Sequence, residues 1–368
     1  MTEAVPLQAL RQRIDDLDRQ LIELFNERAR CAIEVAEIKI KHAKPGEHPV
    51  FYRPERVAQV LRQVQEHNQG PLRDEDVVVL FNHIMSACLA LEQPPKVAYL
   101  GPQGTYSQAA ALQHFGRAIT TVPVAAIDEV FREVASGAVQ FGVVPVENST
   151  EGAVNLTLDS LLEYNLRICG EVEMPIHHNL LVARATKPEH ISRIYSHAQS
   201  LAQCRKWLDS HYPKAERVAL DSNAEAARRV QDEWNSAAIA GNLAAELYDL
   251  QKLQQSIEDR PDNTTRFLVI GDLQVAPSGD DATSIIVSVR NHPGALQQLL
   301  LPFQQAGLDL THVESRPSRS GKWNYVFFID FRGHQDESQV KAVLQTIADQ
   351  SVDLKVLGSY PRAPYFKN

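Results

Sequence analysis

A run of apolar residues at alternating three- and four-residue spacing begins near the amino terminus and most constrains the fold. This spacing is that of a helical seam about five heptads long, so it predicts one helix over about residues 6–42, roughly 50 Å in length. Pro45-Gly46 ends this helix, and shorter helices are expected over about 54–68 and 74–91. Two shorter helices cannot bury so long a seam, so we expect dimerisation. The seam consists of Leu7, Leu10, Ile14, Leu17, Leu21, Leu24, Cys31, Val35 and Ile38.

Two cations lie on or near this seam. Arg28 stands where the spacing predicts Leu or Ile, and Lys39 follows three turns later on nearly the same helix face. A cation that faces a bundle interior needs an anionic partner. The pair therefore favours a ligand with two negative charges. The alternative is internal ion pairing with neighbouring glutamates (Glu23, Glu27, Glu34).

The composition is that of a globular protein with more than one domain. The 368 residues exceed one ordinary core, so two or three domains are expected. The net charge of −9 argues against nucleic acid or an anionic membrane as partner. The absence of a signal pattern and four widely spaced cysteines favour a cytoplasmic protein. No HExxH or paired-cysteine pattern occurs, so neither a metal nor a cofactor is expected.

The middle of the chain, about residues 96–271, alternates strand-like and helical runs. This alternation predicts two α/β lobes around a cleft, as in type II periplasmic binding proteins. Within this segment the polar run 262–266 leads directly into the apolar run 267–270, which is typical of a buried strand. Such a run places hydroxyls, an amide and a guanidinium where a cleft opens. The alternative is a solvated loop before an edge strand.

The last segment, about residues 282–361, has the pattern of a small, separate βαββαβ unit. Strands are expected over 284–289, 308–313, 325–331 and 352–357, and helices over 295–306 and 338–348. Backbone amides at the first helix start can hold a carboxylate.

The helical segment resembles the all-helical chorismate mutase domain, and the resemblance lies in residues 6–18, in Glu27-Arg28 and in Lys39. The resemblance implies that Arg28, Lys39 and Glu92 are catalytic. Arg11 is seventeen residues from Arg28, about 25 Å along the helix, so a second protomer must supply it. The family usually has acidic residues at positions 53 and 57, where this chain has Arg and Val. The chorismate-binding set implied is Arg11, Arg28, Lys39, Arg53, Arg56, Cys88 and Glu92.

The middle segment resembles prephenate dehydratases through five motifs that occur in the family's order: 101–107, 147–150, 196–204, 221–227 and 263–267. The resemblance implies that Thr265 assists departure of the substrate hydroxyl, with Glu147 either relaying a proton or capping backbone amides. Arg266 is expected to hold a carboxylate. The prephenate-binding set implied is Thr105, Ser107, Glu147, Asn148, Ser149, His197, Gln199, Asn263, Thr265, Arg266 and Phe267.

The last segment looks like an ACT regulatory domain, because Pro293-Gly294-Ala295-Leu296 and Glu314-Ser315-Arg316-Pro317 resemble its phenylalanine-binding motifs. L-Phenylalanine is then expected to bind between paired ACT units and to inhibit the enzyme. The effector residues implied are Asn291, Pro293, Gly294, Ala295, Leu296, Glu314, Ser315 and Arg316.

These resemblances together predict three domains, at residues 1–92, 96–271 and 282–361, and membership of the bifunctional chorismate mutase–prephenate dehydratase family. The substrates implied are chorismate and prephenate, and the assembly is a homodimer or a tetramer. The alternative is a non-enzymatic amino-acid sensor on a binding-protein scaffold. Such a sensor has no need of Arg28 with Lys39, or of Thr265-Arg266 at a cleft.

Overall fold

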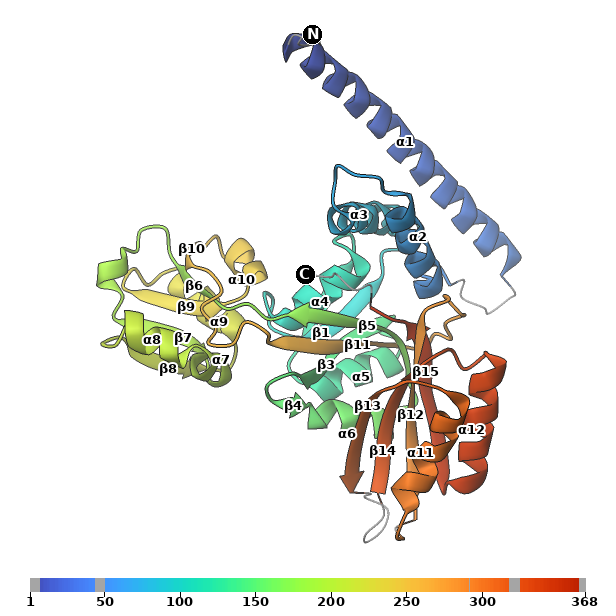
Figure 1. Ribbon diagram of the computed structural model, residues 1–368. Helices are drawn as coiled ribbons and strands as arrows, with labels where there is room; N and C mark the ends of the chain where they lie inside the picture. Colours follow the sequence, from blue (N-terminus) through green and yellow to red (C-terminus); the bar gives the residue numbers. More distant parts are fainter. Residues whose placement is uncertain (1–6, 44–49, 291, 318–324, 364–368) are drawn as a thin grey trace, which may run out of the picture. The chain divides into compact units, whose positions relative to one another are not determined.

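The computed structural model describes residues 7–43, 50–290, 292–317 and 325–363 (Figure 1). Contacts divide the chain into two compact units. The first contains the chain up to Arg53, Val60–Pro95 and Phe115–Ile119. The second contains Pro54–Gln59 and the rest of the chain.

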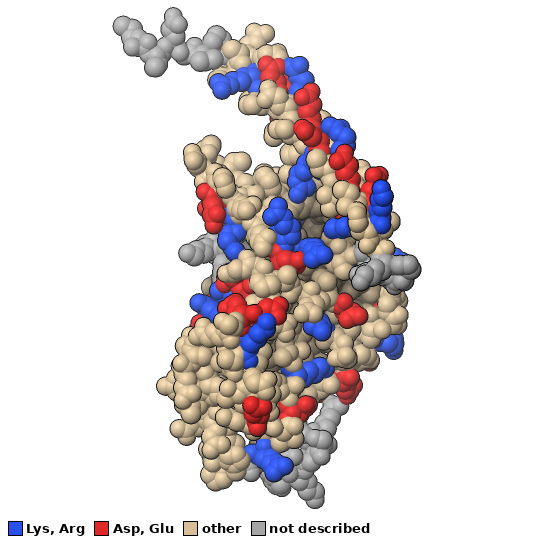
Figure 2. Space-filling model, turned by 90° about the vertical axis from the view of Figure 1, so that its right-hand side faces the viewer, with Lys and Arg blue, Asp and Glu red and all other residues tan. Residues whose placement is uncertain are grey.

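Three helices account for the helical segment, and their bounds agree with the prediction to within one residue. They are α1 (Leu7–His42), α2 (Pro54–His67) and α3 (Asp74–Glu92). The apolar seam of α1 is uncovered in the single chain, since Leu10 is 45% exposed and Leu24 is 59% exposed. Cationic and anionic side chains are interspersed along the rest of α1 (Figure 2). None of the helices in the described ranges has the length and apolar run of a membrane-spanning segment.

The first α/β lobe is built on a sheet with the order β2-β1-β3-β11-β5, to which β4 adds beside β3. Strand β11 is the apolar run predicted to be buried, and it lies antiparallel between β3 and β5. Because β11 has a paired strand on each side, it is not an edge strand. The elements are β1 (Lys96–Leu100), α4 (Tyr106–Phe115), β2 (Thr120–Val124), α5 (Ile127–Ala135), β3 (Phe141–Asn148), β4 (Gly152–Ala153), α6 (Asn155–Glu163), β5 (Arg167–Pro175) and β11 (Thr264–Gly271).

The second lobe has its own sheet, with the order β10-β6-β9-β7-β8. The chain enters this lobe after β5 and returns to the first lobe at β11, so two crossings join the lobes. The predicted two-lobed α/β architecture is confirmed. The elements are β6 (Asn179–Val182), η1 (Pro188–His190), β7 (Arg193–His197), α7 (Ala198–Gln203), α8 (Arg205–His211), β8 (Glu216–Leu220), α9 (Asn223–Val230), β9 (Ser236–Ala240), α10 (Asn242–Leu247) and β10 (Gln251–Gln254).

The last segment has the predicted βαββαβ order in an antiparallel sheet, β13-β14-β12-β15. Its helices cover one face, where Phe303 packs against Phe331. The elements are β12 (Asp281–Val289), α11 (Ala295–Ala306), β13 (Leu310–Pro317), β14 (Tyr325–Arg332), α12 (Ser338–Gln350) and β15 (Asp353–Pro361).

The opposite face of this sheet is packed against the first lobe. The sequence instead predicts that the last segment is a separate unit. Ile286, Phe328 and Leu357 belong to one buried cluster with Val144 and Leu268 of the first lobe. The reason is physical: helices cover only one face of the four strands, and the other apolar face also has to be removed from water. The last segment and the first lobe therefore share a core.

Candidate functional site

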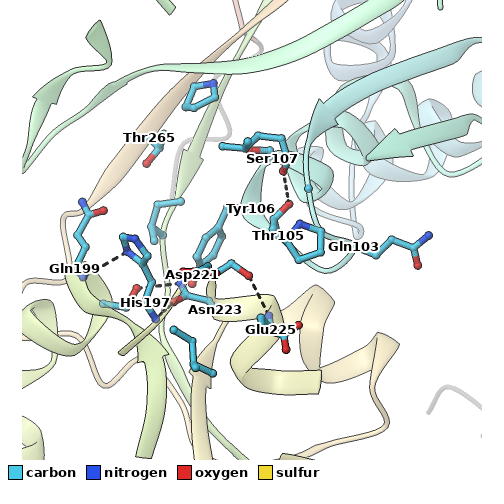
Figure 3. Close-up of a pocket in the computed structure, with 18 of the residues that line it drawn as sticks. Gln103, Thr105, Tyr106, Ser107, His197, Gln199, Asp221, Asn223, Glu225 and Thr265 are labelled. Carbon is cyan, nitrogen blue, oxygen red and sulfur yellow. Dashed lines mark hydrogen bonds between the residues drawn. The ribbon is translucent and has the colours of Figure 1, made fainter. Parts of the chain in front are cut away.

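A cavity of about 1130 Å³ is lined by residues of both α/β lobes. Figure 3 shows Thr105 and Ser107 on one side of it and His197 and Gln199 on the other. Eight of the eleven predicted prephenate residues line this cavity: Thr105, Ser107, Asn148, His197, Gln199, Asn263, Thr265 and Phe267.

Asn148 fixes the orientation of the Thr265 hydroxyl. The Asn148 Oδ1 atom accepts the backbone N–H groups of Thr150, at 3.0 Å, and Glu151, at 3.2 Å. The amide nitrogen must therefore point the other way, where it donates to Thr265 Oγ1 at 2.8 Å and to Asn263 Oδ1 at 3.0 Å. Because the Thr265 oxygen accepts this hydrogen bond, its own proton is available for donation into the cavity.

The hydrogen-bond network continues from Asn263 into the second lobe. Asn263 donates to Gln203 Oε1 at 3.3 Å, and Gln203 donates to Thr150 Oγ1 at 3.2 Å. The ring nitrogens of His178 lie 2.8 Å from Gln203 Oε1 and 3.0 Å from the Tyr106 hydroxyl. Burial lowers the pKa of His178. The network thus links residues of the two lobes beside the cavity.

The sequence predicts no ligand role for Gln203, His178 or Tyr106, although all three line the cavity. A signal existed for Gln203, because it lies four residues after Gln199 and therefore on the same face of a helix. Tyr106 stands between two predicted ligands in the first motif. The burial of His178, which is 1% exposed, depends on tertiary packing.

The cavity also presents donors that suit a carboxylate. His197 caps α7 by accepting the Gln199 N–H at its Nδ1 atom, at 3.4 Å. The other ring nitrogen then carries a proton and is a donor. Opposite, Thr105 and Ser107 stand at the start of α4, where backbone N–H groups lack partners within the helix.

Three predicted prephenate residues lie outside the cavity lining. The Ser149 hydroxyl accepts the Thr264 N–H at 3.0 Å. The Glu147 Oε2 atom lies 3.4 Å from His312 Nδ1. Arg266 pairs with acidic residues that do not line the cavity. Successive side chains of a strand point to opposite faces, so Arg266 faces away from the cavity that Thr265 and Phe267 line.

Lys39 and Glu92, two residues of the predicted chorismate site, interact electrostatically in the first unit. Lys39 is half-buried and its Nζ atom donates to the Phe51 carbonyl at 3.4 Å. Glu92 ends α3, and its Oε2 atom is buried without a hydrogen-bond partner among the described residues. Burial raises the pKa of Glu92, although the charge of Lys39 opposes this shift. Cys88, one turn earlier, is buried.

Arg11 and Arg28, both predicted to bind chorismate, lie far apart within a single chain. Arg11 is exposed and Arg28 half-buried on the same helix, about 25 Å apart along its axis. Arg53 and Arg56 are exposed at the start of α2. A site that uses both Arg11 and Arg28 therefore needs a second chain.

The two predicted effector motifs lie at the same end of the last sheet. Val289, just before the first motif, and Pro317, which ends the second, both pair with Tyr325 of β14. Gly294 is the N-cap residue of α11 and has φ 85°, a left-handed conformation that favours glycine. Arg316 Nη2 pairs with Asp159 Oδ1 of α6 at 3.0 Å. Asn291 lies outside the described residues.

No cluster of three or more His, Cys, Asp or Glu side chains within the described ranges is arranged to hold a metal ion.

Comparisons with known proteins agree with this arrangement. Family models match in consecutive order: chorismate mutase type II over residues 10–93, prephenate dehydratase over 97–274 and the ACT domain over 283–349. A solved prephenate dehydratase from Arthrobacter aurescens, in complex with L-Phe, is 35% identical with a TM-score of 0.68. That match covers 73% of this chain and 90% of the other. The α/β part is thus of the prephenate dehydratase class.

Relatives that span the whole chain define the family more closely. The bifunctional chorismate mutase/prephenate dehydratase of Pseudomonas aeruginosa is 67% identical over 363 residues, which cover 99% of this chain and 100% of that protein. The corresponding protein of Stutzerimonas stutzeri is 64% identical with the same coverage. The chain belongs to the bifunctional chorismate mutase/prephenate dehydratase family.

Proposed function

We propose that this protein rearranges chorismate to prephenate in its helical domain and converts prephenate to phenylpyruvate in the cavity between its α/β lobes. L-Phenylalanine inhibits it through the ACT domain. The observation that carries the dehydratase assignment is the Thr265 hydroxyl, which Asn148 orients toward the cavity. Residues 1–92, 96–271 and 282–361 are the proposed domains. Neither activity requires a cofactor. The four cysteines are free, which supports a cytoplasmic location because thiols stay reduced there.

The dehydratase reaction removes carbon dioxide and hydroxide from prephenate and leaves an aromatic ring. Its barrier falls if fixed donors stabilise the charge that develops on the departing hydroxyl. Thr265 is such a donor, and the hydrogen bond it accepts from Asn148 strengthens its own O–H as a donor. His197 and the amides at the start of α4 hold the substrate carboxylates.

Replacement of Asn148 by aspartate tests the orientation of Thr265. The carboxylate of Asn148→Asp still accepts the turn amides, but its second oxygen accepts the Thr265 proton and turns it away from the cavity. We expect kcat for phenylpyruvate formation to fall about a hundredfold. Ser149→Ala is the control, because its hydroxyl is bonded outside the cavity lining. A kcat within a few-fold of the parent for Asn148→Asp would contradict the assignment.

The mutase site is proposed between two chains. Each site takes Arg28, Lys39 and Glu92 from one chain and Arg11 from the other, and the family resemblance adds Arg53, Arg56 and Cys88. The exposed apolar seam of α1 supports a homodimer, because a long apolar stripe on a helix is buried by a partner. This rearrangement is unimolecular, so the site stabilises charge on the breaking ether oxygen and moves no proton.

Glu92 makes the mutase reaction depend on pH. A protonated Glu92 donates a hydrogen bond to the ether oxygen, whereas an ionised one repels the developing charge. Burial raises the pKa of Glu92, so kcat/KM for chorismate should fall as the pH rises through this raised pKa. Glu92→Gln should flatten that decline. The internal control is the dehydratase profile of the same protein, which should not change. Identical mutase profiles for parent and variant would exclude Glu92 as the donor.

The proposed function is tested directly by incubating the purified protein with chorismate and following prephenate and phenylpyruvate. Formation of both, with suppression of phenylpyruvate by L-phenylalanine, is the expected result. A protein that binds phenylalanine but turns over neither substrate would be the amino-acid sensor that the sequence left open.

A further inference from the structure

Six polar side chains meet between the dehydratase sheet and the ACT sheet, and we call them the interdomain polar cluster. Three lie on adjacent strands of the first lobe and three on the ACT sheet. The members are Glu147 (β3), Arg266 (β11), Glu171 (β5), His312 (β13), Asp330 (β14) and Tyr360 (β15). In Figure 1, β15 lies beside β5 where the two sheets meet.

Arg266 is bonded to both domains at once. Its Nε atom donates to Glu171 at 3.0 Å, its Nη1 atom to Asp330 at 2.6 Å and its Nη2 atom to the Tyr360 hydroxyl at 3.1 Å. The guanidinium is almost buried, since the side chain is 14% exposed. The Tyr360 hydroxyl is held in turn by Ser284 at 2.7 Å. A planar guanidinium with three fixed partners has little freedom to move alone.

Two members of the cluster are sequence neighbours of Thr265 and of Asn148, which orients the Thr265 hydroxyl. Arg266 follows Thr265 directly, and Glu147 precedes Asn148 directly. Strands β11 and β3 pair Thr265 with Asn148 and Arg266 with Glu147, just before their register shifts. A displacement of Arg266 by the ACT sheet therefore changes the distance or angle of the Asn148–Thr265 hydrogen bond. A misplacement of about 1 Å is enough to lower a rate about a hundredfold.

The cluster also extends toward the proposed effector site. Asp330 lies on β14, whose first residue, Tyr325, pairs with the strands that border both effector motifs. Apolar residues of β11 such as Leu268 also belong to the core that the two domains share, but some polar contacts between the domains end on other elements. Lys355 donates to the carbonyls of Leu161 and Tyr164, near the end of α6. Those contacts hold the domains together without reaching β11.

We propose that Arg266 is a positioning residue for Thr265, and that the ACT domain acts on the dehydratase site through the Arg266–Asp330 ion pair. This inference rests on the proposed dehydratase function. It replaces the role of carboxylate ligand that the sequence motif suggests for Arg266. The effector changes the position of β14, Arg266 follows Asp330, and the Thr265 hydroxyl leaves its orientation for catalysis.

The first test is Asp330→Asn in the full-length protein, which keeps the shape of the side chain and removes its charge. Without L-phenylalanine, phenylpyruvate formation should stay within a few-fold of the parent. The concentration of L-phenylalanine for half-inhibition should rise at least tenfold, while calorimetry shows that L-phenylalanine still binds.

The second test separates positioning from substrate binding. Arg266→Lys keeps the positive charge but cannot reach three partners in fixed directions. A positioning residue predicts a kcat at least tenfold lower with KM for prephenate unchanged, together with weaker inhibition. A carboxylate ligand predicts a raised KM. Tyr360→Phe removes one acceptor with little change in volume, and it should weaken inhibition in the same direction as Asp330→Asn.

Two controls match these variants. Lys355→Met removes a contact between the domains that ends on α6, and Asp309→Asn removes the ion pair with Arg332 inside the ACT domain. Both should retain inhibition. The inference is overturned if Asp330→Asn and Tyr360→Phe are inhibited like the parent, or if Lys355→Met loses inhibition equally. A parent that forms no phenylpyruvate would instead refute the proposed function.

Discussion

Thr265→Ala is expected to lower kcat for phenylpyruvate formation by a factor of about a hundred to a thousand, the effect of losing one fixed donor to a developing anion. The Asn148 amide then loses its hydroxyl partner, and the departing hydroxyl of prephenate loses its donor. Chorismate mutase activity should persist, because the proposed mutase residues other than Arg56 lie in the other compact unit. Both activities are measured on the same preparation, so a loss of folded protein would lower them together.

Two neighbouring substitutions make this result specific. Thr265→Ser keeps the hydroxyl and should retain most of the activity. Thr264→Ala removes a hydroxyl from the adjacent residue, which does not line the cavity, and should be close to the parent. Dehydratase turnover in Thr265→Ala within a few-fold of the parent would remove Thr265 from the mechanism.

Arg28→Ala and Arg11→Ala should each lower mutase kcat/KM about a thousandfold, since each removes a cation that binds a substrate carboxylate. A mixture of the two inactive chains should recover activity. In a heterodimer, one site carries both lesions and the other is intact, so random exchange in equal amounts restores about a quarter of the parent activity. Recovery is measured with chorismate after subunit exchange has been verified.

The matched control is a mixture of Arg28→Ala with Lys39→Ala. Both of these residues come from the same chain of a proposed site, so every site in the heterodimer carries one lesion. No recovery is expected. Equal recovery in the two mixtures, or none in either, would refute a site shared between chains.

Much of the fold was predictable because it repeats locally. The three-to-four spacing from Leu7 to Ile38 predicts α1, and the bounds of α11, Ala295–Ala306, are those expected from the sequence. Periodicity depends on which face of an element is buried, and that information is present in every turn of a helix. The sequence motifs predict the order of the three domains, and the family models confirm that order.

The site was only partly predictable, and Arg266 shows why. Its motif places it beside Thr265, but its partner Asp330 is 64 residues away in the sequence. The alternation of side chains along a strand held one signal: if Thr265 faces a cleft, the next residue does not. Which anion then holds the guanidinium is decided by the packing of a second sheet. His178 is similar, because its ring contacts Tyr106, 72 residues away.

The core shared by the first lobe and the ACT sheet bears on how regulation can be removed by engineering. Truncation of the chain before β12 would expose apolar residues such as Leu268 and Val144 to water. Arg266 and Glu171 would keep each other but lose their hydrogen-bond partners in the removed segment. The catalytic lobe would lose stability along with its inhibitor site. An enzyme that ignores phenylalanine while remaining soluble is therefore better sought by exchanging single side chains, with the ACT sheet kept in place as part of the catalytic domain.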